Sequence, residues 1–260
     1  MVNDDRQLGQ ILNRRDVLKL LGLGSAATVV AACAPEIAQT LSTTSLPSTV
    51  APAIQAATEG ATSSIAIPMC VVRPELTEGP YFVDEMLNRS DIRSDPSDGS
   101  ITQGAQLSLA FNVSQVGANG CTPLAGAQVD IWHCDAHGVY SDAQDRNFNT
   151  VGKKFLRGYQ VTDANGLAQF ITIYPGWYNG RAVHIHFKIR VNSYEFTSQL
   201  FFDDAFTDQA YVQEPYAQRG ERTLRNTQDN IYNNGGSQLI LISAPDGAGY
   251  TAAFDIGVQL

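Results

Sequence analysis

Residues 171–187, ITIYPGWYNGRAVHIHF, are the stretch around which the rest of this chain is organised. The stretch ends in an H-x-H pair, and alternate side chains of a β-strand point to the same face. His184 and His186 would therefore lie side by side, while Ile185 and Phe187 point to the opposite face. Two imidazoles on one strand face form a natural half of a metal site. The alternative is a pair of exposed histidines on a half-buried strand.

A break in the strand pattern precedes the two histidines. Pro175 and Gly176 would end the preceding strand and let Tyr178 fold back over the histidine face. Arg181 lies between the tyrosine and the H-x-H pair. The tyrosine and the arginine favour a functional site over an exposed pair.

Short apolar-polar alternations occur on both sides of this stretch. Leu107, Leu109, Phe111 and Val113 alternate with polar or small residues, a period of two that predicts a strand with one buried face. Turn signals separate many such segments, and only residues 208–217 suggest a short helix. The pattern predicts an all-β fold, an antiparallel β-sandwich with long irregular loops. The expected strands are 107–113, 129–132, 156–161, 167–173, 183–191, 194–202, 238–243 and 251–256.

Three turn sequences lie between consecutive expected strands. Asn165-Gly166 predicts a hairpin between strands 156–161 and 167–173. Asn192-Ser193 closes the next pair of strands, and Asp246-Gly247 lies between the last two.

The first 33 residues have the features of an export signal. The sequence NRRDVLKL at 13–20 contains a twin arginine and leads into an apolar run, too short for an ordinary transmembrane helix. Small residues before Cys33 resemble a bacterial lipoprotein processing site, so Cys33 is a candidate lipid anchor. The alternative is ordinary cleavage and release. We expect export through the twin-arginine route, to a cell-surface lipoprotein or to a periplasmic or extracellular location.

Composition divides the remainder of the chain. Residues 34–64 are rich in Ala, Thr, Ser and Pro, so we expect a flexible tether there. Residues 65–260 are long enough for one substantial core. The formal net charge of −9 argues against nucleic acid as a partner and against electrostatic attachment to anionic lipid.

An exported protein can contain a disulfide. Cys121 and Cys134 lie on either side of an expected strand, roughly 20 Å or more apart if that strand is extended. That separation is too large for a disulfide, so Cys70 is the better candidate partner for one of them. The sequence leaves open which one.

Tyr140 ends the loop after the expected strand 129–132 and completes a candidate ligand set with Tyr178, His184 and His186. Two phenols and two imidazoles suit a hard trivalent ion better than zinc. Phenol has a pKa near 10, so only a strongly Lewis-acidic centre such as non-haem Fe(III) would hold both tyrosines deprotonated. An Fe(II) site with two histidines and one carboxylate is the competing arrangement, but no Asp or Glu lies at the expected spacing beside His184.

Four separated stretches resemble the intradiol ring-cleavage dioxygenases, the family of catechol and protocatechuate dioxygenases. They are TEGPY at 77–81, WHCDAHGVY at 132–140, the region from 162 to the PGWY at 175–178, and RAVHIH at 181–186. The resemblance covers about residues 70–260, and the export signal points to an exported branch of the family.

The resemblance implies roles for individual residues. Tyr140, Tyr178, His184 and His186 would be Fe(III) ligands. Arg181, Tyr178 and Gln199 would be catalytic, with Arg181 beside the substrate ring and Tyr178 accepting a substrate proton. Tyr81 would bind substrate together with Arg181 and Gln199; the alternative for Gln199 is a solvent-facing strand residue.

The implied reaction is cleavage of a catechol-type ring between its two hydroxylated carbons with O2, giving a cis,cis-muconate-type diacid. A non-catalytic exported β-sandwich binding module, or a simple metal-binding protein, is the alternative. The choice of catechol and the oligomeric state stay open. His133 and His137 are expected to be solvated or structural.

Overall fold

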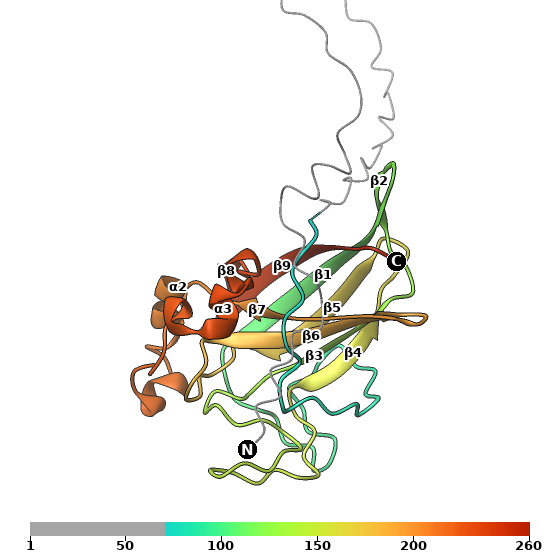
Figure 1. Cartoon of the computed structure of the whole chain (residues 1–260). Coiled ribbons are helices and arrows are strands. Elements are labelled where there is room, and N and C mark those ends of the chain that lie inside the picture. The colour runs from blue at the N-terminus through green and yellow to red at the C-terminus, as the bar shows by residue number, and fades with distance from the viewer. Residues whose placement is uncertain (1–70) are drawn as a thin grey trace, which may run out of the picture. The chain divides into compact units, whose positions relative to one another are not determined.

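A computed structural model describes residues 71–260 of the chain (Figure 1). The predictions for the signal (1–33), the tether (34–64), Cys33 and Cys70 lie outside the described residues. Within the described part, no helix is both long and apolar enough to cross a membrane.

Sheet A is a five-stranded sheet among the described residues. Its central strand, β1, pairs with β2 and β5 along one edge and with β9 along the other, as Figure 1 shows for the neighbouring β1 and β9. The strands of sheet A are β1 (Gln106–Gly117), β2 (Gly120–Pro123), β5 (Leu167–Ile173), β8 (Ser243–Asp246) and β9 (Gly249–Val258).

Sheet B is a four-stranded sheet of the described part, with the order β4-β3-β6-β7 and antiparallel pairing throughout. Asn192, at φ 53°, forms the predicted tight turn between β6 and β7. The strands are β3 (Gln128–Trp132), β4 (Arg157–Val161), β6 (His184–Val191) and β7 (Tyr194–Phe201).

The core lies between the two sheets. Alternation on β1 turns Leu109 and Phe111 inward, and alternation on β6 turns Ile185 and Phe187 inward. The rings of Phe111 and Phe187 have centroids 5.3 Å apart. Burying one such side chain contributes roughly 1.5–3 kcal/mol. Because the odd-numbered residues of β6 enter the core, its even-numbered residues face the outer side of sheet B.

The predicted all-β sandwich is confirmed, with one correction to the antiparallel prediction. β1 and β9 are parallel, whereas every other strand pair in the described residues is antiparallel. Parallel neighbours need a long crossover connection. Many residues separate β1 from β9, so the connection is long enough.

The predicted hairpin at 165–166 is wrong. β4 belongs to sheet B and β5 to sheet A, so this turn crosses between the sheets. Contacts on both sides hold the crossing: Thr162 Oγ1 donates to the carbonyl of Leu124 at 2.6 Å, and the Val113 amide donates to the carbonyl of Gly166 at 2.8 Å. An Asn-Gly sequence specifies a tight turn but not the partner of the next strand.

The predicted strand 238–243 is also wrong. Its apolar residues Leu239 and Leu241 are buried, but they make only a bridge to Phe201 at the end of β7. The predicted helix 208–217 is shifted towards the N-terminus, because Asp203 accepts from the Phe206 amide and caps α2. The short helices of this region are α2 (Asp204–Ala210), η1 (Tyr216–Arg219), η2 (Asn226–Gln228), α3 (Asn230–Asn233) and η3 (Gly236–Gln238).

Candidate active site

The outer face of sheet B carries the two histidines. His184 and His186 are the first and third residues of β6, and they are 2% and 1% exposed. The strand register places Trp132 of β3 and Gln199 of β7 on either side of His186. The predicted shared face is confirmed, but loops cover it, so the alternative of exposed histidines is wrong.

Tyr140 and Tyr178 come from two loops that pack against each other. A Cβ atom at Gly176 would lie 2.4 Å from the carbonyl oxygen of Asp135 and 2.5 Å from that of Ala136. The Gly176 amide also donates to the Asp135 carbonyl at 3.1 Å. Since only glycine allows this approach, Gly176 brings the segment before Tyr178 against the segment before Tyr140.

Four side chains converge at one point, and we call them the donor cluster: Tyr140, Tyr178, His184 and His186. Nε2 of His184 lies 3.0 Å from Nε2 of His186, 3.2 Å from Oη of Tyr178 and 3.5 Å from Oη of Tyr140. Nδ1 of His184 lies 2.7 Å from the carbonyl oxygen of Ala182, to which it donates. That bond leaves Nε2 of His184 as the atom that faces the cluster.

The spacing of the donor cluster fits one bound ion. Donor atoms about 2.1 Å from a common ion are about 3.0 Å apart at 90° and about 3.6 Å apart at 120°. The three distances to Nε2 of His184 run from 3.0 to 3.5 Å. Within residues 71–260 no three His, Cys, Asp or Glu side chains are grouped to hold a metal. A site at this point therefore needs its tyrosines, which disfavours the carboxylate-containing alternative.

Burial keeps the donor cluster uncharged when no cation is bound. Burial, with Arg181 nearby, lowers the pKa of His184 and of His186 well below the ordinary value. Burial raises the pKa of Tyr140 well above its ordinary value and that of Tyr178 to about 12, although Arg181 opposes both increases. The imidazoles are thus ready to bind a cation, whereas the phenols lose their protons only to a strong Lewis acid.

Arg181 lies at the edge of the donor cluster. Its Nη1 is 3.4 Å from Nε2 of His184, and its Nη2 donates to Oε1 of Gln199 at 2.6 Å. Gln199 is fully buried and donates from Nε2 to the carbonyl of Thr77 at 2.7 Å, so the solvent-facing alternative for Gln199 is wrong. The structure brings both predicted residues to the site.

Asp229 is a site residue that the sequence did not reveal. Its Oδ2 accepts from Nε of Arg181 at 3.0 Å and from the Ala182 amide at 2.8 Å. Its Oδ1 accepts from the Ile231 amide at 2.7 Å and caps α3. The only sequence signal is an aspartate before a short helix, and this signal does not identify a partner 48 residues away.

Tyr81 packs against both tyrosines of the donor cluster. Its ring stacks on that of Tyr140 with centroids 4.5 Å apart, and it meets the ring of Tyr178 edge-on at 6.4 Å. Its hydroxyl donates to Oδ2 of Asp145 at 2.9 Å. The family resemblance implied that Tyr81 binds substrate, but the sequence did not predict its hydrogen bond to Asp145.

Trp132 was also missed as a site residue. Its ring stacks on that of His186 with centroids 5.1 Å apart and an interplanar angle of 8°. A signal was available, because the alternation of β3 places this large aromatic residue on the outer face, where a polar residue is expected.

The two additional histidines lie outside the donor cluster. His133 is buried, with Nε2 2.7 Å from Oγ1 of Thr172 and Nδ1 2.8 Å from the carbonyl oxygen of Cys134. Burial lowers the pKa of His133 to about 4. His137 is exposed. The expected structural or solvated roles are confirmed.

The cysteines follow the prediction as far as the described residues reach. Cys134 is free and buried, and Cys121 is disulfide-bonded. The prediction that Cys121 and Cys134 do not form a disulfide with each other is therefore confirmed. Cys70, the predicted partner, lies outside the described residues.

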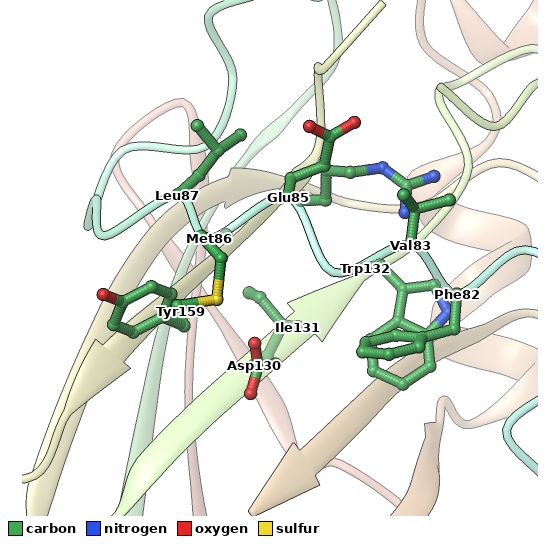
Figure 2. Close-up of a pocket in the computed structure, with 11 residues that line it drawn as sticks. Phe82, Val83, Glu85, Met86, Leu87, Asp130, Ile131, Trp132 and Tyr159 are labelled. Atoms are coloured by element: carbon green, nitrogen blue, oxygen red, sulfur yellow. The ribbon is translucent and has the colours of Figure 1, made fainter. Parts of the chain in front are cut away.

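A pocket between residues 82–87 and β3 is separate from the donor cluster (Figure 2). Phe82, Met86, Asp130 and Tyr159 are among its lining residues, and none of the four donors lines it. This pocket is not the candidate substrate site.

Comparisons with known proteins identify the family. The sequence model of the family described as Dioxygenase matches residues 77–241. An intradiol ring-cleavage dioxygenase from Tetranychus urticae is 31% identical and superposes with a TM-score of 0.65 over 73% of this chain and 95% of that chain. This chain belongs to the intradiol ring-cleavage dioxygenases, a family of oxidoreductases.

Two further relatives show how far the similarity extends. The dioxygenase domain of a dioxygenase carbohydrate-binding protein fusion from Streptomyces sp. SirexAA-E is 27% identical, with a TM-score of 0.54 over 73% of this chain and 99% of that one. The chlorocatechol 1,2-dioxygenase of Pseudomonas putida is 30% identical over 31% of this chain and 36% of its own length. The chain thus spans about a third of the length of this curated relative.

Proposed function

We propose that this protein is a non-haem Fe(III) dioxygenase. It cleaves catechol-type rings between the two hydroxylated carbons with O2 and produces cis,cis-muconate-type diacids. The observation that carries the proposal is the approach of His186, Tyr178 and Tyr140 to Nε2 of His184, at 3.0 to 3.5 Å.

The donor cluster would hold the iron through Tyr140, Tyr178, His184 and His186. When bound, Fe(III) supplies a Lewis-acidic centre that binds the catechol oxygens and makes the ring reactive towards O2. The protein supplies two neutral imidazoles and two phenols in a buried setting, which suits a hard, highly charged ion.

Arg181 is suited to stabilise negative charge on the substrate ring. Its guanidinium is a planar, delocalised cation, and Nη1 of Arg181 lies 3.4 Å from Nε2 of His184. Asp229 and Gln199 hold its other nitrogens, so the cation is oriented before substrate binds. Such preorganised charge favours a transition state in which charge develops nearby.

Tyr178 is suited to accept a substrate proton at Oη. Burial raises its pKa to about 12, so this oxygen binds a proton firmly whenever it is not bound to a cation. The position of Tyr178 beside Nε2 of His184, at 3.2 Å, puts that acceptor at the donor cluster.

Aromatic rings lie next to the donor cluster, which suits a planar substrate ring. Tyr81 covers Tyr140, and Phe148 lies beside Tyr81 with ring centroids 6.2 Å apart. Similar proteins include chlorocatechol, hydroxyquinol and catechol 1,2-dioxygenases. These three rings form the first substrate panel for this chain.

The decisive experiment is the visible absorption spectrum of the purified protein, before and after addition of catechol without oxygen. We expect a red-brown phenolate-to-iron band that shifts when catechol binds, followed by turnover of the panel in air. A protein that stays colourless after reconstitution with iron would overturn the proposal and favour the non-catalytic binding module.

We also propose export through the twin-arginine route with lipidation at Cys33. The support is the NRRDVLKL sequence and the small residues before the cysteine. Mass spectrometry of the mature N-terminus tests this proposal. An acylated N-terminal cysteine is expected, and cleavage at another position without a lipid would overturn lipidation.

A further inference from the structure

A lysine is buried on the same strand face as two residues of the donor cluster. Lys188 follows His186 by two positions on β6 and is only 7% exposed. Burying an ammonium group is costly unless charged or aromatic partners surround it. Its partners are two carboxylates and one ring: Nζ lies 2.5 Å from Oε2 of Glu78, 3.4 Å from Oε2 of Glu195 and 4.4 Å from the Phe82 ring centroid.

Two of these partners belong to the segment 77–84, which lies across the outer face of sheet B. The segment carries Tyr81, whose ring stacks on Tyr140. It also carries Gly79, at φ 75°, where a Cβ atom would lie 3.1 Å from Cε1 of His186. The segment 77–84 therefore contacts the donor cluster at two points.

Phe82 connects the segment 77–84 to His186 indirectly, through the ring of Trp132. Its ring packs against Trp132 with centroids 4.7 Å apart, as the close-up shows (Figure 2), and Trp132 stacks on His186 at 5.1 Å. A small pocket lies between residues 82–87 and β3. Side chains of sheet B hold the segment: Arg157 donates to the Tyr81 carbonyl at 3.1 Å and Arg190 pairs with Asp84 at 2.7 Å. Lys188 holds both Glu78 and Phe82.

The two histidines differ in how their rings are held. His184 has a hydrogen bond from Nδ1 to the carbonyl of Ala182. Nδ1 of His186 is buried and has no hydrogen-bond partner among the residues that the structure describes. Apart from the approach of its Nε2 to Nε2 of His184 at 3.0 Å, the His186 ring is held by packing against Trp132 and Gly79.

We propose that Lys188 is a positioning residue for the donor cluster. By holding Glu78 and Phe82, it keeps the segment 77–84 against His186 and keeps Tyr81 stacked on Tyr140. The effect on iron rests on the proposed function, whereas the effect on the segment does not.

The first arm of the test is hydrogen exchange on the metal-free protein. In Lys188→Met we expect the amides of residues 77–84 to exchange about tenfold faster, because the local opening free energy falls. Lys153→Met is the charge control, since its pair with Asp98 is exposed on both sides. Val113→Ala is the stability control, because it removes core contacts in sheet A. Unchanged exchange in 77–84, or an equal increase in Val113→Ala, would overturn the proposal.

The second arm uses iron-loaded protein. Release of iron to a chelator should be about tenfold faster in Lys188→Met, with a shifted phenolate-to-iron band, and Lys188→Arg should restore both. If Lys188→Met releases iron at the same rate as Val113→Ala and has the same spectrum, Lys188 contributes only to general stability and the positioning role is overturned. If Lys188→Met does not fold, Glu78→Gln breaks the same pair from its more exposed side. If the wild-type protein binds no iron, the proposed function has failed, and the exchange arm alone decides the role of Lys188 in holding the segment.

Discussion

Nε of Arg181 donates to Oδ2 of Asp229 at 3.0 Å, and the accepting side chain is 1% exposed. One carboxylate thus fixes the guanidinium at the donor cluster and caps α3. The long polar segment between β7 and β8 therefore takes part in building the site.

Asp229→Asn should preserve shape but remove the charge that orients Arg181. We expect kcat to fall by about tenfold because the guanidinium loses its fixed position. Breaking a buried ion pair should also lower the free energy of unfolding by about 3 kcal/mol. Steady-state kinetics and urea unfolding measure the two effects. Asp208→Asn is the control, because its pairs with Arg222 and Arg225 lie away from the donor cluster. An unchanged kcat would show that the charge of Asp229 does not orient Arg181 for catalysis.

Tyr140→Phe and Tyr178→Phe should each weaken iron binding and alter the colour of the protein. Each substitution removes one phenol oxygen that lies within 3.5 Å of Nε2 of His184. Iron analysis and visible absorption give the readout. Tyr174→Phe is the matched control, since this buried tyrosine bonds to Thr207 and not to the donor cluster. Loss of colour in the control as well would point to general unfolding.

His184→Ala should abolish retention of iron. His184 supplies the atom on which the other three donors converge, and its loss removes one of the two ring nitrogens of the donor cluster. Metal analysis after gel filtration tests this expectation, with the exposed His137→Ala as control. A fully active, iron-replete His184→Ala protein would contradict the ligand assignment.

Ionisation of the buried Asp130 carboxyl should lower the free energy of unfolding as the pH rises. Burial raises its pKa from 3.8 to about 6, although Arg190 opposes the shift. Between these values the folded protein binds more protons than the unfolded chain, so stability falls between about pH 4 and pH 6, by up to about 3 kcal/mol. Asp130→Asn removes this dependence. The free energy of unfolding of the variant minus that of wild type should therefore rise over this range and then level off. Urea unfolding at several pH values tests the prediction, and a constant difference would contradict it.

Local patterns predicted much of the fold and of the site. Alternation on β6 identified His184 and His186 on one face, and the Pro-Gly break located Tyr178. These features depend on residues close together in the chain, so their spacing fixes their geometry. The family resemblance added Gln199 and a role for Arg181, and the structure brings these two side chains within 2.6 Å of each other.

Features that depend on distant residues could not be predicted in the same way. The partner of Arg181 lies 48 residues away in a segment without periodicity. The Asn-Gly turn at 165–166 gave no information on which sheet receives β5. The apolar residues near Leu239 suggested a strand, but their side chains pack into the core while their backbone makes only one bridge to the end of β7. In each case the tertiary partner, not the local sequence, decides the outcome.

The parallel pairing of β1 with β9 constrains the order in which this protein is built during synthesis. Asn112 and Asp255 face each other in that pairing across a separation of 143 residues. A nascent chain that has completed β1 therefore carries an open sheet edge until β9 has emerged from the ribosome. The β1–β9 pairing joins strands far apart in the chain, so we expect it to form later than local pairings such as β6 with β7.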